Sequence, residues 1–150
     1  MSRLPVYALL LTAALSGAAC GSDDDPTPPP SGQTPIEVVE TITGPLTVNG
    51  AVTHSFPVER AGDITAVLTA VTGAGDTPPA ISIALGTWNG VSCAIVVAND
   101  KATPPPAGTS PTAISSVIGR ATVPGNFCLR VSDPGTLTVA VEYTVDLRHF

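Results

Sequence analysis

The chain has 150 residues, with six Lys and Arg residues against twelve Asp and Glu residues, which gives a formal net charge of −6. An acidic chain with so few cations lacks the positive surface that nucleic-acid binding requires. Charged residues make up only 12% of the chain, whereas 14 Gly and 16 Pro residues break it at short intervals. This composition excludes a nucleic-acid-binding protein and favours one β-rich domain with many turns.

Residues 1–19 have the pattern of a secretory signal peptide. Arg3 supplies a positive charge, residues 4–15 are predominantly apolar, and residues 16–19 are small. The apolar run is too short to span a bilayer permanently. The alternative is a buried core helix, which the charged start and the small-residue exit disfavour. We therefore expect residues 1–19 to direct export and to be removed.

Cys20 follows directly after these small residues. The arrangement resembles the lipobox of bacterial lipoproteins, a family in which the thiol is diacylglycerated and the signal is cut just before it. Lipoproteins usually have Leu three residues before the cysteine, where this chain has Gly17, so ordinary cleavage after Ala19 stays open as the alternative. The resemblance implies a membrane anchor on Cys20, since two or more acyl chains hold firmly. Gly21 in place of Asp favours the outer membrane over the inner one.

Two further cysteines, Cys93 and Cys128, complete the set of three. If Cys20 is lipidated, two thiols remain. In an oxidising compartment, Cys93 and Cys128 are then expected to form a disulfide. Closing a loop of about 36 residues stabilises a fold by roughly 3–4 kcal/mol on the chain-entropy model. Zinc is disfavoured because it needs four clustered ligands and only His54 and His149 are available to join the pair.

Residues 21–35 read GSDDDPTPPPSGQTP and offer no apolar side chain to a core. Such a segment buries too little apolar surface to offset the entropy that it would lose on ordering. We therefore expect residues 20–35 to form a lipidated, disordered tether. The Pro-rich part favours an extended form that reaches at most about 45 Å. The three aspartates of this segment are expected to be a solvated spacer and not a metal site.

Residues 36–150 are predicted to form one all-β domain, an antiparallel β-sandwich. Apolar residues alternate with small or charged ones most clearly along 137–148, which indicates a half-buried strand. Asn49-Gly50 and Asn89-Gly90 predict hairpins. Pro-Gly pairs at 124–125 and 134–135 predict type II turns. Strands are expected near residues 37–43, 45–48, 51–59, 63–72, 80–88, 91–98, 113–122, 126–132 and 137–148. The Pro-rich segment 101–112 is expected to be an exposed loop.

Several motifs follow one another in a characteristic order. They are Phe56-Pro57-Val58, Ala61-Gly62-Asp63-Ile64-Thr65, Ile81-Ser82-Ile83-Ala84-Leu85, Ala98-Asn99-Asp100, Pro124-Gly125-Asn126-Phe127-Cys128-Leu129-Arg130-Val131 and Tyr143-Thr144-Val145. From about Val52 to Leu147 this order resembles the bacterial pre-peptidase C-terminal domain family. The resemblance implies a jelly-roll-like β-sandwich. Some members bind calcium or matrix polymers, but no peptidase domain accompanies the module here.

The candidate ligand-binding residues are Trp88, Asn99, Asp100 and Asp133. Trp88 beside a hairpin is suited to stack on a sugar ring, although packing at the sheet edge is the alternative. The other three lie at predicted turns, where calcium finds oxygen ligands but where Asn and Asp also serve local hydrogen bonds. A hydrolase built on His54 is a third reading, for which no nucleophile elbow or oxyanion motif is present.

These features predict a membrane-anchored envelope lipoprotein that is not an enzyme and whose β-sandwich is a binding or structural module. The expected partners are the membrane, through the lipid, and envelope proteins or extracellular polysaccharide. A carbohydrate- or calcium-binding accessory domain is the alternative. No cofactor is expected except calcium under that alternative.

Overall fold

The structure is a computed structural model that describes residues 36–150. The predicted signal peptide, Cys20 and the tether lie outside the described residues. Eight strands form the described part: β1 (Val38–Leu46), β2 (Ala51–Val58), β3 (Gly62–Thr72), β4 (Ile81–Trp88), β5 (Cys93–Ala102), β6 (Ser116–Ala121), β7 (Gly125–Ser132) and β8 (Val141–His149). Over residues 36–150, no helix is long and apolar enough to cross a membrane.

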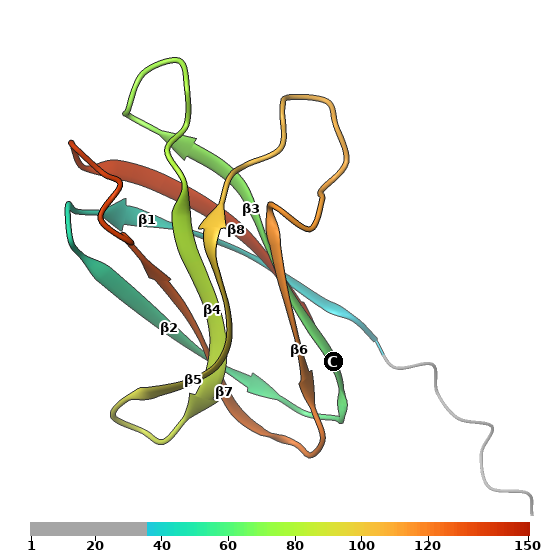
Figure 1. The fold of residues 1–150 in the computed structure, drawn as a ribbon. Helices are drawn as coiled ribbons and strands as arrows, with labels where there is room; N and C mark the ends of the chain where they lie inside the picture. The colour runs from blue at the N-terminus through green and yellow to red at the C-terminus, as the bar shows by residue number, and fades with distance from the viewer. Residues whose placement is uncertain (1–35) are drawn as a thin grey trace, which may run out of the picture. The chain divides into compact units, whose positions relative to one another are not determined.

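The strands form two antiparallel four-stranded sheets that pack face to face (Figure 1). The strand orders are β1-β8-β3-β6 and β2-β7-β4-β5. Successive strands therefore alternate between the two sheets, except at the β4–β5 hairpin. Eight strands arranged in this way make a jelly roll. The predicted antiparallel β-sandwich, jelly-roll-like in its connections, is confirmed.

Alternating side chains along β8 explain how one strand serves both the core and the solvent. Val141, Tyr143, Val145 and Leu147 are buried, and the residues between them are more exposed. This is the period of two expected for a strand with one face on the core. By contrast, β4 is buried at every position from Ile81 to Gly86, so both of its faces are covered.

The Cys93–Cys128 disulfide forms as predicted, with the two Cα atoms 5.8 Å apart. Cys128 is fully buried but does not belong to the central core cluster. It pairs in register with Gly86 of β4. A Cβ added at Gly86 would collide with the carbonyl oxygen of Ala94. The start of β5 therefore lies against the bare backbone of β4, and the disulfide fastens it to β7.

The first two predicted strands are one strand, because Pro45 sits inside β1, an edge strand that tolerates it. Asn49-Gly50 was wrongly predicted as a hairpin. Gly50 donates its N–H to Thr47 O at 2.9 Å and Asn49 has a φ of 57°, so a tight turn exists. However, it joins strands of opposite sheets. The hairpin at Asn89-Gly90 is confirmed, since β4 and β5 pair antiparallel.

Three boundaries also differ from the predictions. The last strand begins at Val141 because residues 133–137 form a turn, in which Gly135 has the predicted positive φ. Gly125 begins β7 and is not among the positive-φ glycines, so the predicted type II turn there is wrong. The Pro-rich loop occupies residues 103–115.

Candidate functional site

The two sheets have open edges on opposite sides of the sandwich. On one side lie β1 and β2, joined by the turn at residues 47–50. On the other side lie β5 and β6, joined by the loop at residues 103–115. No strand pairing connects β5 to β6 in the described chain, so an edge of each sheet faces the gap between them.

A groove and a cavity occupy this second side. The groove has a volume of about 830 Å³ and is open to solvent; its lining residues are Val97, Ala98, Asn99, Asp100, Lys101, Pro111, Thr112, Ala113, Ser116, Val117 and Ile118. The cavity is smaller, about 190 Å³, and more enclosed; its lining residues are Ile64, Leu85, Gly86, Thr87, Val96, Val97, Gly119, Arg120, Thr122, Val123 and Phe127. Val97 lines both spaces, so they adjoin. We call the surface formed by these residues the β5–β6 seam.

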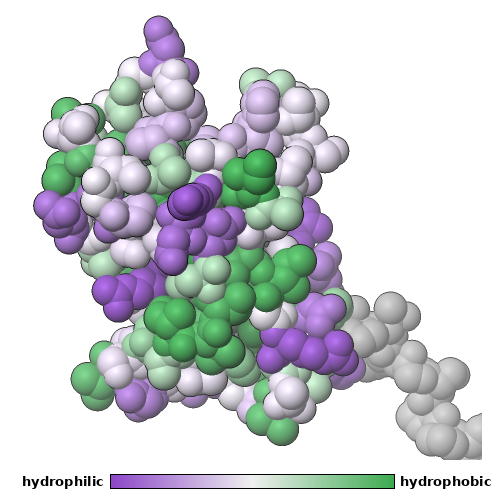
Figure 2. Space-filling view, viewed as in Figure 1, coloured by the Kyte–Doolittle hydropathy of each residue, from purple (hydrophilic) through white to green (hydrophobic). Residues whose placement is uncertain are grey.

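Exposed aliphatic side chains gather on the β5–β6 seam and beside it. Val96 is 75% exposed, Ile118 is 62% exposed and Val123 is 63% exposed. Ile95 and Ile114 are exposed nearby in the sequence. Figure 2 shows hydrophobic side chains gathered on the face that carries β5 and β6. Large exposed apolar patches are uncommon on soluble monomers and mark interaction surfaces.

Asn99 holds the loop beside the groove. Its side-chain amide donates to the backbone oxygens of Ala113, Ile114 and Ser116, at 3.3, 3.0 and 3.0 Å. Its side-chain oxygen accepts the N–H of Lys101 at 3.2 Å. This predicted ligand-binding residue is therefore engaged in shaping the groove.

Asp100 has a hydrogen-bond partner within the described domain, whereas Lys101 has no ion-pair partner there. The Asp100 carboxylate accepts the hydroxyl of Ser82 at 2.7 Å. Within residues 36–150, Lys101 forms no ion pair with a carboxylate. Lys101 lines the groove, so its charge is available to a ligand that enters there.

Asp133 organises the turn that follows β7. One carboxylate oxygen accepts the backbone N–H groups of Gly135, Thr136 and Leu137, and the other accepts that of Asn49 at 2.7 Å. Desolvation raises the pKa of Asp133, and these four hydrogen bonds outweigh it and bring the pKa below the ordinary 3.8. The two Asp133 oxygens that calcium would need thus already accept hydrogen bonds from backbone N–H groups.

Trp88 does not join the other three candidates. It lies half-buried at the last position of β4, where it pairs with Cys93 beside the hairpin. Asp100 bonds to Ser82 near the opposite end of the same strand, and Ser82 pairs with Ser132 just before Asp133. The structure therefore places Trp88 at one end of β4 and the acidic candidates toward the other.

The two described histidines lie near the opposite side of the sandwich. His54 Nε2 is 2.7 Å from the Tyr143 hydroxyl, and burial lowers the pKa of His54 and raises that of Tyr143. His149 is 4% exposed, packs on Phe56, and lies 3.8 Å from a Glu40 oxygen. No hydrogen bond from a Ser hydroxyl to either ring is present among the described residues. Nor do residues 36–150 contain a group of three His, Cys, Asp or Glu side chains placed to hold a metal.

Comparisons with known proteins bear on the fold alone. No family model and no curated protein matches the chain. The crystal structure of a Yersinia pseudotuberculosis-derived mitogen is similar, with a TM-score of 0.53 and 15% sequence identity, over 77% of this chain and 88% of that chain. A periplasmic inhibitor of g-type lysozyme from Aeromonas hydrophila, PliG, matches at 12% identity over 73% of this chain and 83% of that one. Its TM-score of 0.44 is too low to support a fold assignment. The pre-peptidase C-terminal resemblance stays a prediction.

Sequence reasoning missed the β5–β6 seam. The run Cys93 to Ala98 is apolar at every position, without the alternation of a half-buried strand. That signal is typical of a strand buried on both faces. In this fold the run is largely exposed instead, because β5 is an edge strand. A continuous apolar run next to a Pro-rich loop was the clue.

Proposed function

We propose that this chain is a non-catalytic, exported lipoprotein whose β-sandwich binds another envelope protein through the β5–β6 seam. The observation that carries the proposal is the group of exposed aliphatic side chains on and beside β5 and β6, two edge strands that do not pair with each other. Exposed apolar surface of this kind is a common feature of protein-binding sites. The signal pattern before Cys20 supports export, and so does a disulfide that an oxidising compartment would preserve.

A carbohydrate ligand receives less support from the same surface. The seam is lined mainly by aliphatic side chains, and Phe127 is the one aromatic residue in its lining. A sugar ring stacks on an exposed aromatic face, and Trp88, the candidate for that role, lies outside the lining. Calcium is disfavoured because the side chains of Asn99, Asp100 and Asp133 already form hydrogen bonds within the domain. A hydrolase is disfavoured because the hydrogen-bond partner of His54 is a tyrosine.

Site-specific photo-crosslinking in the native cell tests the seam. A benzoylphenylalanine in place of Ile118 should give a discrete protein adduct. The same group in place of Val39, an exposed apolar residue on the opposite edge strand, is the matched control. Adducts from both positions, or from neither, would contradict the assignment of the seam as the binding surface.

The intact mass of the mature protein tests the anchor. We expect a product that begins at Cys20 and carries three acyl groups, and a Cys20→Ser variant that carries none. A product that retains Met1, or one that begins at Cys20 without lipid, would overturn the lipoprotein assignment. Neither result would affect the crosslinking experiment, because the two experiments test different parts of the proposal.

A further inference from the structure

The two edge strands of the seam differ in regularity. β6 pairs with β3 at each of its six positions without a shift in register. β5 pairs with β4 through two register shifts, which twist it away from a regular edge. A regular edge strand is a template onto which a further strand adds, whereas bulges protect an edge from such pairing. β6 is therefore the edge strand of the seam that is suited to pair with a further strand.

Little protects the outer edge of β6. It contains no proline, and Arg120 is its one charged residue. The Asn99 amide occupies the carbonyl of Ser116, at the start of the strand. This leaves the stretch from Val117 to Ala121 with no neighbouring strand on its outer side in the described chain.

The cavity offers a place for one side chain of an added strand. Gly119 lies in the middle of β6 and lines the cavity. A Cβ added there would lie 3.4 Å from Leu85 and 3.6 Å from Val97, in ordinary contact. The missing side chain thus leaves room beside the core. Alternate side chains of a strand point to one face, so one of them can enter such a pocket and provide specificity.

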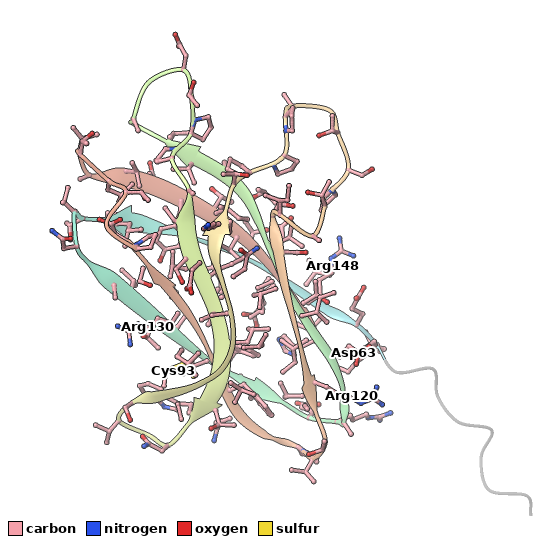
Figure 3. The ribbon with its side chains drawn as sticks, viewed as in Figure 1. Asp63, Cys93, Arg120, Arg130 and Arg148 are labelled. Atoms are coloured by element: carbon pink, nitrogen blue, oxygen red, sulfur yellow. A yellow bond between two sulfur atoms is a disulfide. The ribbon has the colours of Figure 1, made fainter. Side chains whose placement is uncertain are left out.

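Two cations flank this apolar surface in an otherwise acidic protein. Lys101 lies near the end of β5, and Arg120 lies near the opposite end of the seam because the two strands run antiparallel. Figure 3 shows Arg120 beside Asp63, with which it forms an ion pair at 3.4 Å. Lys101 has no such partner in residues 36–150. A complementary ligand therefore carries a carboxylate at the end that meets Lys101.

We infer that the β5–β6 seam binds an extended segment of a partner protein, which adds as a strand to the edge of β6, places an aliphatic side chain in the cavity at Gly119 and directs a carboxylate at Lys101. The inference rests on the function proposed above and specifies its ligand. A second copy of this chain fits less well. Its own β6, SVIGRA, would bring another arginine and no carboxylate to the seam.

Selection of a random peptide library displayed on phage, with the full mature chain as the target, tests the inference. We expect the selected peptides, about ten residues long, to alternate aliphatic or β-branched residues with polar ones and to carry Asp or Glu at one end. Hydrogen exchange should slow by about tenfold or more in the complex at every second amide between Val117 and Ala121, the ones that point away from β3, because added-strand hydrogen bonds protect them.

Matched variants assign the contacts, with fluorescence anisotropy of a selected peptide as the readout. Lys101→Glu should weaken binding by about tenfold or more, whereas Arg130→Glu, on a β7 position outside the seam, should change it by less than about twofold. Gly119→Leu should abolish binding by filling the cavity. Thr53→Leu, which places the same leucine side chain at an exposed position of β2, should not. If Gly119→Leu does not fold, the comparison of Lys101→Glu with Arg130→Glu and the hydrogen-exchange data still test the inference.

Three results would overturn the inference. The first is that no peptide is enriched. The second is that the enriched peptides leave β6 amides unprotected, which would reject strand addition even if Ile118 still crosslinks to a protein. The third is a dimer in sedimentation equilibrium with β6 protected in the absence of peptide, which would make a second copy the occupant. Loss of the Ile118 crosslink while peptides still bind would instead count against the proposed envelope partner.

Discussion

The Nε2 atom of His54 on β2 lies 2.7 Å from the hydroxyl of Tyr143 on β8, so a hydrogen bond joins the two sheets through the interior. Tyr143 is fully buried, and His54 is partly buried. A buried hydroxyl needs such a partner, because an unsatisfied one costs about 1–3 kcal/mol. The pair is thus a polar connection inside a core that is otherwise largely apolar.

Acid is expected to destabilise the domain through His54. Burial lowers the pKa of His54 below its ordinary 6.5, so the unfolded chain binds this proton more readily than the folded one. The contribution to stability is fully present above pH 6.5 and is lost as the pH falls below that value. Thermal melts from about pH 7 to about pH 5 should show a smaller decrease in Tm for His54→Gln than for the wild type. Parallel decreases would contradict the role of His54.

Reduction of the disulfide should destabilise the fold strongly. The bond closes a separation of 35 residues between Cys93 and Cys128, for which the chain-entropy model gives about 3–4 kcal/mol. Urea unfolding with and without dithiothreitol measures the difference. The Cys93→Ser, Cys128→Ser double variant should match the reduced wild type and should not respond to the reductant. A wild type that unfolds at the same urea concentration in both conditions would contradict the prediction.

Gly86 and Gly119 should differ in how much an alanine substitution destabilises the fold. Gly86→Ala places a methyl group against the Ala94 carbonyl, and overpacking against backbone costs about 1–3 kcal/mol. Gly119→Ala meets neighbours only at contact distance, so its effect should stay within about 0.5 kcal/mol. Chemical denaturation of both variants checks the pair. A Gly86→Ala variant that is as stable as the wild type would contradict the close contact with the Ala94 carbonyl.

The turn after β7 should depend on an ionised Asp133. The pKa of Asp133 is lowered from 3.8, so its contribution to stability is present above that pH and is lost as the pH falls through the lower folded value. Asp133→Asn should therefore lower Tm at neutral pH and have little effect in strong acid. Asp76→Asn, at an exposed position between β3 and β4, is the control and should change Tm at neither pH. A pH-independent loss in Asp133→Asn would indicate that the charge is not what matters.

The sequence predicted the class of fold because β-strand alternation and turn residues are local signals. Leu147 and its buried neighbours on β8 could be assigned to one face without knowledge of any partner strand. Asn49-Gly50 shows the limit of this reasoning. The pair correctly indicates a reversal of the chain, but the sheet that β2 joins depends on long-range pairing with β7.

The candidate site was harder to predict for the same reason. Asn99 and Asp133 were predicted to lie in turns that could bind a ligand, but Asn99 lies within β5, and the hydrogen bonds of both side chains hold the backbone of the domain. The apolar run from Cys93 to Ala98 marks β5, but the β5–β6 seam depends on which strands end each sheet, and the run alone does not show that β5 is an edge strand. The disulfide was predictable because the number of cysteines and the expected compartment left one pair.

The loop from 103 to 115 is fastened at its base and independent in its middle. Thr103 donates its N–H to Ile114 O, and Asn99 holds the returning chain. Farther out, Thr109 bonds back to Pro106, so the tip is a self-contained turn. Lengthening a loop whose ends are already held costs little entropy. The tip is therefore a site where foreign epitopes can be grafted and displayed while the scaffold beneath keeps its shape.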